Sequence, residues 1–167
     1  MSVGIYFLLF CSMFAVSTSP LIARHLNHLD PIAIAFWRMI TGALIMHAFS
    51  LFSLGKKSLS KKNNIQTIIA GILLGLHFAL FYGAIILLPN NMVNATVFGT
   101  LAPLFALLIE IYFGRKIGLN LVIGLIIILI GSFLMFVSDF SFNSELTKGN
   151  ILAVMCSICF AFVFIIS

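Results

Sequence analysis

No Asp, Glu, Lys or Arg occurs between residues 63 and 109, and this charge-free stretch is long enough for two helices that each cross a lipid bilayer. Of all 167 residues, 62% are hydrophobic and 8% are charged, whereas an ordinary soluble domain is about 25% charged. So few charges cannot cover a soluble globule, but lipid solvates apolar side chains directly. We therefore expect an all-α, polytopic bundle of membrane-spanning helices without a soluble catalytic domain.

The apolar runs predict six spans. Asp30 followed by Pro31 is a typical helix start for span two, and Pro89 begins the turn between spans three and four. The sixth apolar run stops at Ser167 and is barely long enough to cross. The predicted organisation is a five-span unit over residues 1–137, an extracytoplasmic loop over 138–149 and an incomplete sixth span over 150–167.

Basic residues predict the orientation, because Lys and Arg are enriched in cytoplasmic loops. If successive connections alternate sides, six basic residues share one side of the membrane: Lys56, Lys57, Lys61, Lys62, Arg115 and Lys116. Only Arg24 and Lys148 lie on the other side. We therefore expect a cytoplasmic amino terminus in an inner or plasma membrane. The cations are too few and too close to the span ends for a nucleic-acid-binding surface.

A weak internal repeat links the two ends of the chain. Three residues near the amino terminus recur with the same spacing near the other end, since Gly4, Cys11 and Ser12 match Gly149, Cys156 and Ser157. A second copy that follows five spans enters the membrane with the opposite polarity. The repeat therefore predicts an inverted-topology architecture, which is typical of secondary transporters.

Span four contains a proline near its middle. Pro103 has no amide hydrogen, so the carbonyl of Gly99 loses its helical partner at bilayer depth and needs a polar neighbour or water. Thr96 and Thr100 share a helix face with Pro103, and Asn94 lies in the same segment. Two interpretations use these residues: a kink that lines a substrate cavity, and a packing kink stabilised by threonine hydroxyls.

Span three combines small residues with two polar rings. Its small residues recur every four positions, at Gly71, Gly75, Ala79 and Gly83. Such a stripe lets helices approach closely. His77 lies on the other side of the helix and is either a hydrogen-bonded histidine of the bundle or a contact for substrate or protons. Tyr82 either lines a pore or anchors an interface.

Two charged residues lie inside predicted spans. Arg38 is seven residues into span two, about 10 Å along the helix axis, so we interpret it as a structural anchor or a gating charge. Glu110 lies about one turn before Arg115 and Lys116, and pairing with these cations is favoured over proton coupling.

Sequence signatures of enzymes are absent. The chain has no phosphate-binding glycine loop, no H-E-x-x-H helix and no pair of intramembrane carboxylates. Cys156 and Cys159 form a C-x-x-C pair, but no His or further Cys lies near enough to complete a zinc site. We therefore expect no enzyme, no catalytic residue, no metal site and no cofactor.

Over its whole length the chain resembles the EamA-type domain of the drug/metabolite transporter superfamily. The resemblance rests on Pro31 and Arg38 near the start of span two, on the glycine-rich span three and above all on span four. In span four, Asn-Ala-Thr at 94–96 precedes Leu-Ala-Pro-Leu-Phe at 101–105, which is similar to the proline-containing signature of the family. In the turn after span four, Gly114, Arg115 and Lys116 stand where members often carry a glutamate.

The resemblance implies a carrier of small metabolites, such as amino acids or related solutes, that works by alternating access. Its polar substrate contacts are expected to be Ser17, His77, Tyr82, Asn94, Thr96 and Thr100. Because the family usually has ten spans in two units, a missing carboxyl-terminal half or a second copy in a homodimer is expected to complete the cavity. The alternatives are a non-transporting membrane scaffold or assembly subunit, and an inactive half-length fragment.

Overall fold

A computed structural model of the protein describes residues 3–52, 61–88, 92–99, 101–114, 118–138 and 144–166. These residues contain helices and no strand, which confirms the all-α prediction. The helices are α1 (Val3–His25), α2 (Pro31–Phe52), α3 (Lys61–Leu87), α4 (Met92–Gly99), α5 (Ala102–Tyr112), α6 (Leu119–Ser138) and α7 (Ser144–Ile166).

Most of the described helices are as long as membrane spans. Five segments of the described chain are long and apolar enough to cross a bilayer: Gly4–His25, Pro31–Leu51, Asn63–Leu87, Met92–Tyr112 and Leu146–Ile166. The apolar part of α6, Leu119–Leu134, is shorter. The predicted membrane helix bundle is therefore confirmed. The cytoplasmic amino terminus stays a prediction, and four of the basic residues behind it, Lys56, Lys57, Arg115 and Lys116, lie outside the described residues.

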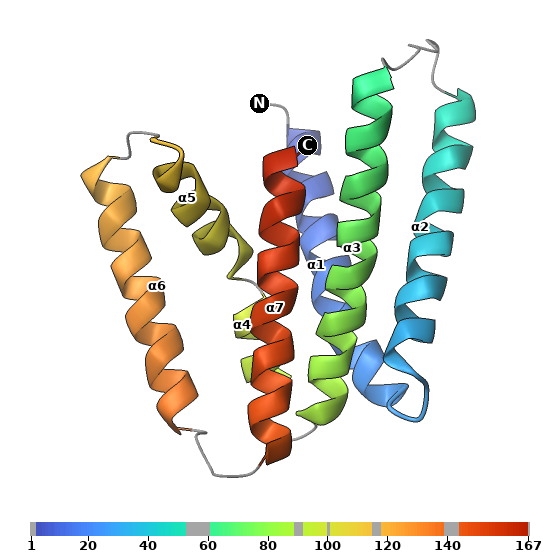
Figure 1. Ribbon diagram of the computed structural model, residues 1–167. Coiled ribbons are helices and arrows are strands. Elements are labelled where there is room, and N and C mark those ends of the chain that lie inside the picture. The colour runs from blue at the N-terminus through green and yellow to red at the C-terminus, as the bar shows by residue number, and fades with distance from the viewer. Residues whose placement is uncertain are drawn as a thin grey trace.

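The helices lie roughly alongside one another (Figure 1). α1 descends from the amino terminus at the top of the view, and α7 ascends to the carboxyl terminus at the top, so the two helices run in opposite directions. α3 and α7 lie side by side at the centre and share the largest contact. α2 packs on α3, whereas α4 and α5 pack on α7. α7 begins at Ser144, inside the segment expected to be a loop.

The core lies where α3 faces α7, and small residues allow the close approach of these helices. A Cβ atom added at Gly149 of α7 would lie 2.6 Å from Cγ of Leu88, so only glycine fits at this position. At Gly83 of α3, an added Cβ would lie 3.4 Å from Leu152 of α7. Since lipid is as apolar as these side chains, such packing is what holds helices together in a membrane.

The small-residue stripe of α3 is close-packed over only part of its length. A Cβ added at Gly71 or Gly75 would meet nothing within 4 Å, so the close approach expected there is not observed. Gly75 instead borders an apolar pocket of about 310 Å³ between α2 and α3. Phe36 and Met39 of α2 also line this pocket.

Large apolar side chains cover the outer faces of α1, α2 and α6. Phe10, Met46 and Phe133 are 69%, 71% and 65% exposed, respectively. Such exposure would be unfavourable in water, but lipid or a second apolar protein surface accommodates it.

Candidate functional site

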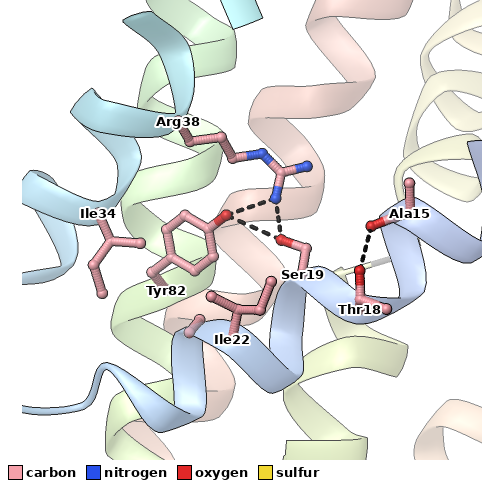
Figure 2. A pocket seen from close by; sticks show the side chains of 8 residues that line it. Ala15, Thr18, Ser19, Ile22, Ile34, Arg38 and Tyr82 are labelled. Atoms are coloured by element: carbon pink, nitrogen blue, oxygen red, sulfur yellow. Dashed lines mark hydrogen bonds between the residues drawn. The ribbon is translucent and has the colours of Figure 1, made fainter. Parts of the chain in front are cut away.

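Polar side chains from three helices meet in a pocket between α1, α2 and α3 (Figure 2). Nη1 of Arg38 donates hydrogen bonds to the Tyr82 hydroxyl, at 2.6 Å, and to the Ser19 hydroxyl. The two hydroxyl oxygens lie 3.1 Å apart and share a further hydrogen bond. This space, which we call the Arg38 pocket, has a volume of about 270 Å³ and is lined by Ala15, Thr18, Ser19, Ile22, Ala23, Ile34, Arg38 and Tyr82.

Ser19, Arg38 and Tyr82 can meet because they lie at similar distances from the same end of the bundle. A short turn joins α1 to α2, and Ser19 lies six residues before the end of α1 at His25. Arg38 lies seven residues after the start of α2 at Pro31. At 1.5 Å per residue, both are about 10 Å from the turn that joins the helices. Tyr82 lies five residues before the end of α3, at the same end of the bundle.

Arg38 is half-buried, and the partners of its guanidinium group are neutral. Besides the two hydroxyl groups, it contacts Phe78, whose ring centroid lies 4.2 Å from Cζ of Arg38 in a cation–π geometry. Within the described parts of the chain, no carboxylate is among the contacts of Arg38. The pocket therefore presents a positive charge and hydroxyl groups between mostly apolar walls.

A break separates α4 from α5 in the fourth span, as the position of Pro103 predicts. Pro103 lies in the first turn of α5, where a proline lacks no helical hydrogen bond. The carbonyl of Phe98 accepts hydrogen bonds from the Ser157 hydroxyl of α7 and from the Leu101 amide, the latter at 3.3 Å. The expected polar neighbour is therefore present, but it bonds the carbonyl of Phe98, one residue before the predicted Gly99.

Gly99 allows α3 to approach this break. A Cβ atom at Gly99 would lie 2.8 Å from two ring atoms of Phe81, so a larger residue does not fit. Phe81 directly precedes Tyr82 on α3. Consecutive residues of one helix therefore contact the break on one side and the Arg38 pocket on the other.

His77 joins α3 to α7. Its Nδ1 atom lies 2.9 Å from the carbonyl oxygen of Cys156 and 3.2 Å from Sγ of the same residue. Its ring stacks on Phe160 with the centroids 4.5 Å apart, and the side chain is only 7% exposed. Because a carbonyl only accepts, Nδ1 carries the proton in this bond. This is the geometry of a histidine that connects two helices.

Among the described residues, the other predicted substrate contacts do not join Tyr82 in one site. Ser17 is exposed and donates a hydrogen bond to a carbonyl of its own helix, and Thr96 does the same within α4. Asn94 is buried and has an interaction partner. Thr100 lies outside the described residues.

The sequence alone pointed to Tyr82 but missed Ser19, and it treated Arg38 as an anchor or a gating charge. Ser19 could have been noticed because it lies about as far from the turn between α1 and α2 as Arg38 does. Glu110 is half-buried and has an interaction partner, but the cations expected to pair with it lie outside the described residues. Among the described residues, no group of three or more His, Cys, Asp or Glu side chains is placed to hold a metal ion.

These features define a polytopic membrane protein that has a broken fourth span and a polar pocket between its first three helices. The EamA-like transporter family matches residues 3–137, and the chain belongs to this family. The resemblance found in the sequence is thereby confirmed, and the family consists of membrane transporters of the drug/metabolite superfamily. Comparison with curated proteins and with solved structures found no significant match.

Proposed function

We propose that the chain forms part of a carrier that moves small metabolites, such as amino acids or related solutes, across an inner or plasma membrane by alternating access. The break between α4 and α5 is the observation that carries this proposal. Backbone that leaves a helix at membrane depth is tolerated where it is buried in protein or lines a cavity, and transporters place their binding sites at such breaks. Ser157 of α7 and Phe81 of α3 both contact the break.

In this proposal, a second five-span unit completes the transport path, either in the same polypeptide or in a second copy. The three repeat residues of α7 are buried against the first unit, namely Gly149, Cys156 and Ser157. Their counterparts on α1 face outward: Cys11 and Ser12 are exposed, and a Cβ added at Gly4 would meet nothing within 4 Å. This face of α1 is therefore suited to receive the second unit in the way that α3 and α4 receive α7.

Flux measurements in proteoliposomes test the proposal. The intact gene product is reconstituted, and the uptake of radiolabelled amino acids and short organic acids is followed. Pro103→Ala supplies an amide hydrogen at the break and is expected to reduce flux at least tenfold. Pro31→Ala, at the first position of α2, is the matched control and is expected to leave flux within about twofold. Equal flux in the Pro103→Ala variant and the unaltered protein would contradict the proposal.

A further inference from the structure

We propose that the Arg38 pocket binds the carboxylate group of a short, apolar monocarboxylate. This inference rests on the proposed function and narrows its class of solutes. Arg38 supplies the positive charge, the hydroxyl groups of Ser19 and Tyr82 supply a further donor, and the apolar residues of the lining surround the rest of the solute.

Hydrogen-bond donors remain for a ligand after the internal contacts are counted. Arginine has five N–H groups, and the contacts of Arg38 with Ser19 and Tyr82 both come from Nη1. Figure 2 shows the other terminal nitrogen of Arg38 directed away from these hydroxyl groups. The two hydroxyl groups carry two protons, and the hydrogen bond between them uses one. Arg38 therefore keeps N–H donors that its internal contacts do not use, and the pair of hydroxyl groups keeps one O–H.

The position of the Arg38 guanidinium group differs from that of a snorkelling arginine, which extends its charge to the membrane surface. Snorkelling would direct the guanidinium toward the turn between α1 and α2. The group instead stacks on Phe78, which lies nine residues before the end of α3 and so one turn deeper than Tyr82. At 1.5 Å per residue, Tyr82 and Phe78 place the guanidinium group of Arg38 about 7 to 14 Å from the end of α3. An arginine cation at this depth calls for an anionic partner, and its contacts in the described chain are neutral.

The charge and shape of the pocket favour one class of anion. A guanidinium edge binds a carboxylate through two parallel hydrogen bonds, and one positive charge balances one negative charge. A phosphate monoester carries a charge of about −1.5 to −2 and would leave excess negative charge between apolar walls. The ammonium group of an amino acid would add a second cation beside Arg38, and no acidic side chain is among the described residues that line the pocket. A monocarboxylate without an amino group fits best.

Three solutes with one carbon skeleton test this inference by ligand-observed NMR on the full chain in nanodiscs: 4-methylpentanoate, its neutral amide 4-methylpentanamide, and leucine. Hydrogen bonds to charged groups are strong enough for an effect of roughly 10- to 100-fold. We expect 4-methylpentanoate to bind at least tenfold more tightly than the amide and more tightly than leucine. Equal affinity for acid and amide, or tighter binding of leucine, overturns the inference.

Charge-matched variants locate the site. Arg38→Gln is expected to weaken binding of 4-methylpentanoate at least tenfold, whereas Arg24→Gln, which removes an exposed cation from α1, leaves it within about twofold. Tyr82→Phe is expected to weaken binding of 4-methylpentanoate about threefold to tenfold, and Tyr112→Phe, at an exposed tyrosine, is its control. This second pair of variants tests the site even if Arg38→Gln does not fold. Equal losses in a variant and its control overturn the inference.

A lipid headgroup is the other source of an anion at this depth. Short-chain dioctanoyl phosphatidylglycerol is therefore added as a competitor, and tighter binding of this lipid than of 4-methylpentanoate overturns the inference. The flux assay separates this result from a failure of the proposed function. Arg38-dependent binding without flux supports the carboxylate site and contradicts the carrier, whereas amino acid flux that is unchanged in Arg38→Gln supports the carrier and contradicts the carboxylate site.

Discussion

Nη1 of Arg38 on α2 lies 2.6 Å from the hydroxyl oxygen of Tyr82 on α3, although the two residues are far apart in the sequence. The Ser19 hydroxyl on α1 bonds both groups, so one polar cluster ties the first three helices together. Apolar packing between α2 and α3 is loose at Gly75, where an open pocket lies between the helices. The polar cluster therefore contributes to the placement of α2 as well as to the candidate site.

Replacing Tyr82 by phenylalanine tests the structural part of this role. Tyr82 is 2% exposed, and its hydroxyl bonds a charged group, so Tyr82→Phe is expected to lower the free energy of unfolding by about 1.5 to 3 kcal/mol. Chemical denaturation in detergent measures the change. Tyr112→Phe removes a hydroxyl from a side chain that is 86% exposed and is expected to change stability by less than about 0.5 kcal/mol.

Replacing Ser157 by alanine tests the support of the helix break. The Phe98 carbonyl would lose its side-chain donor at a fully buried position, so we expect a loss of about 1 to 3 kcal/mol in stability. Ser50→Ala removes an exposed hydroxyl group from α2 and serves as the control in the same thermal unfolding experiment. Similar melting temperatures for the two variants would show that the bond to Phe98 does not stabilise the break.

Replacing Gly149 by alanine tests the contact between α7 and α3. The new Cβ would lie 2.6 Å from Leu88, and relieving such overpacking is expected to cost about 1 to 3 kcal/mol. Gly124→Ala, on α6, adds a Cβ that meets nothing within 4 Å and is expected to be neutral or slightly stabilising because alanine favours helix. The prediction fails if thermal unfolding ranks the two variants in the opposite order.

Replacing His77 by phenylalanine separates its two interpretations. The variant keeps an aromatic ring against Phe160 but loses the hydrogen bond to the Cys156 carbonyl. We expect a stability loss of about 1 to 3 kcal/mol, with affinity for 4-methylpentanoate within about twofold of the unaltered protein. Exposed His47→Phe is the control for loss of an imidazole. A tenfold loss of affinity with unchanged stability would instead assign His77 to the binding site.

Residues that act within one helix could be predicted from the sequence. The lengths of the charge-free segments predict the spans, and the missing amide hydrogen of Pro103 predicts the break. Both features depend only on local chemistry. The donor that supports the break could not be predicted, since Ser157 lies on another helix and bonds Phe98 through tertiary packing. The same limit applies to Gly75, where the spacing favours close packing but a pocket lies between α2 and α3.

The candidate site was predicted only in part for the same reason. Tyr82 and Arg38 attracted notice as polar groups in apolar spans, but their contact depends on how three helices align. Ser17 has the same chemistry as Ser19, yet it is exposed and bonds its own helix. Two residues along α1 correspond to a rotation of about 200°, so the hydroxyl groups of the two serines lie on opposite faces.

Phe81 and Tyr82 are about 100° apart on one turn of α3, so their backbone positions move together while that turn stays helical. Rotation of α3 that withdraws Phe81 from Gly99 therefore also displaces the Tyr82 hydroxyl from Arg38. In the proposed carboxylate site, a solute that fixes α3 at Tyr82 would therefore also restrict its movement at the break between α4 and α5. Under the proposed function, reciprocal coupling would then make the affinity for that solute depend on how α3 packs against the break.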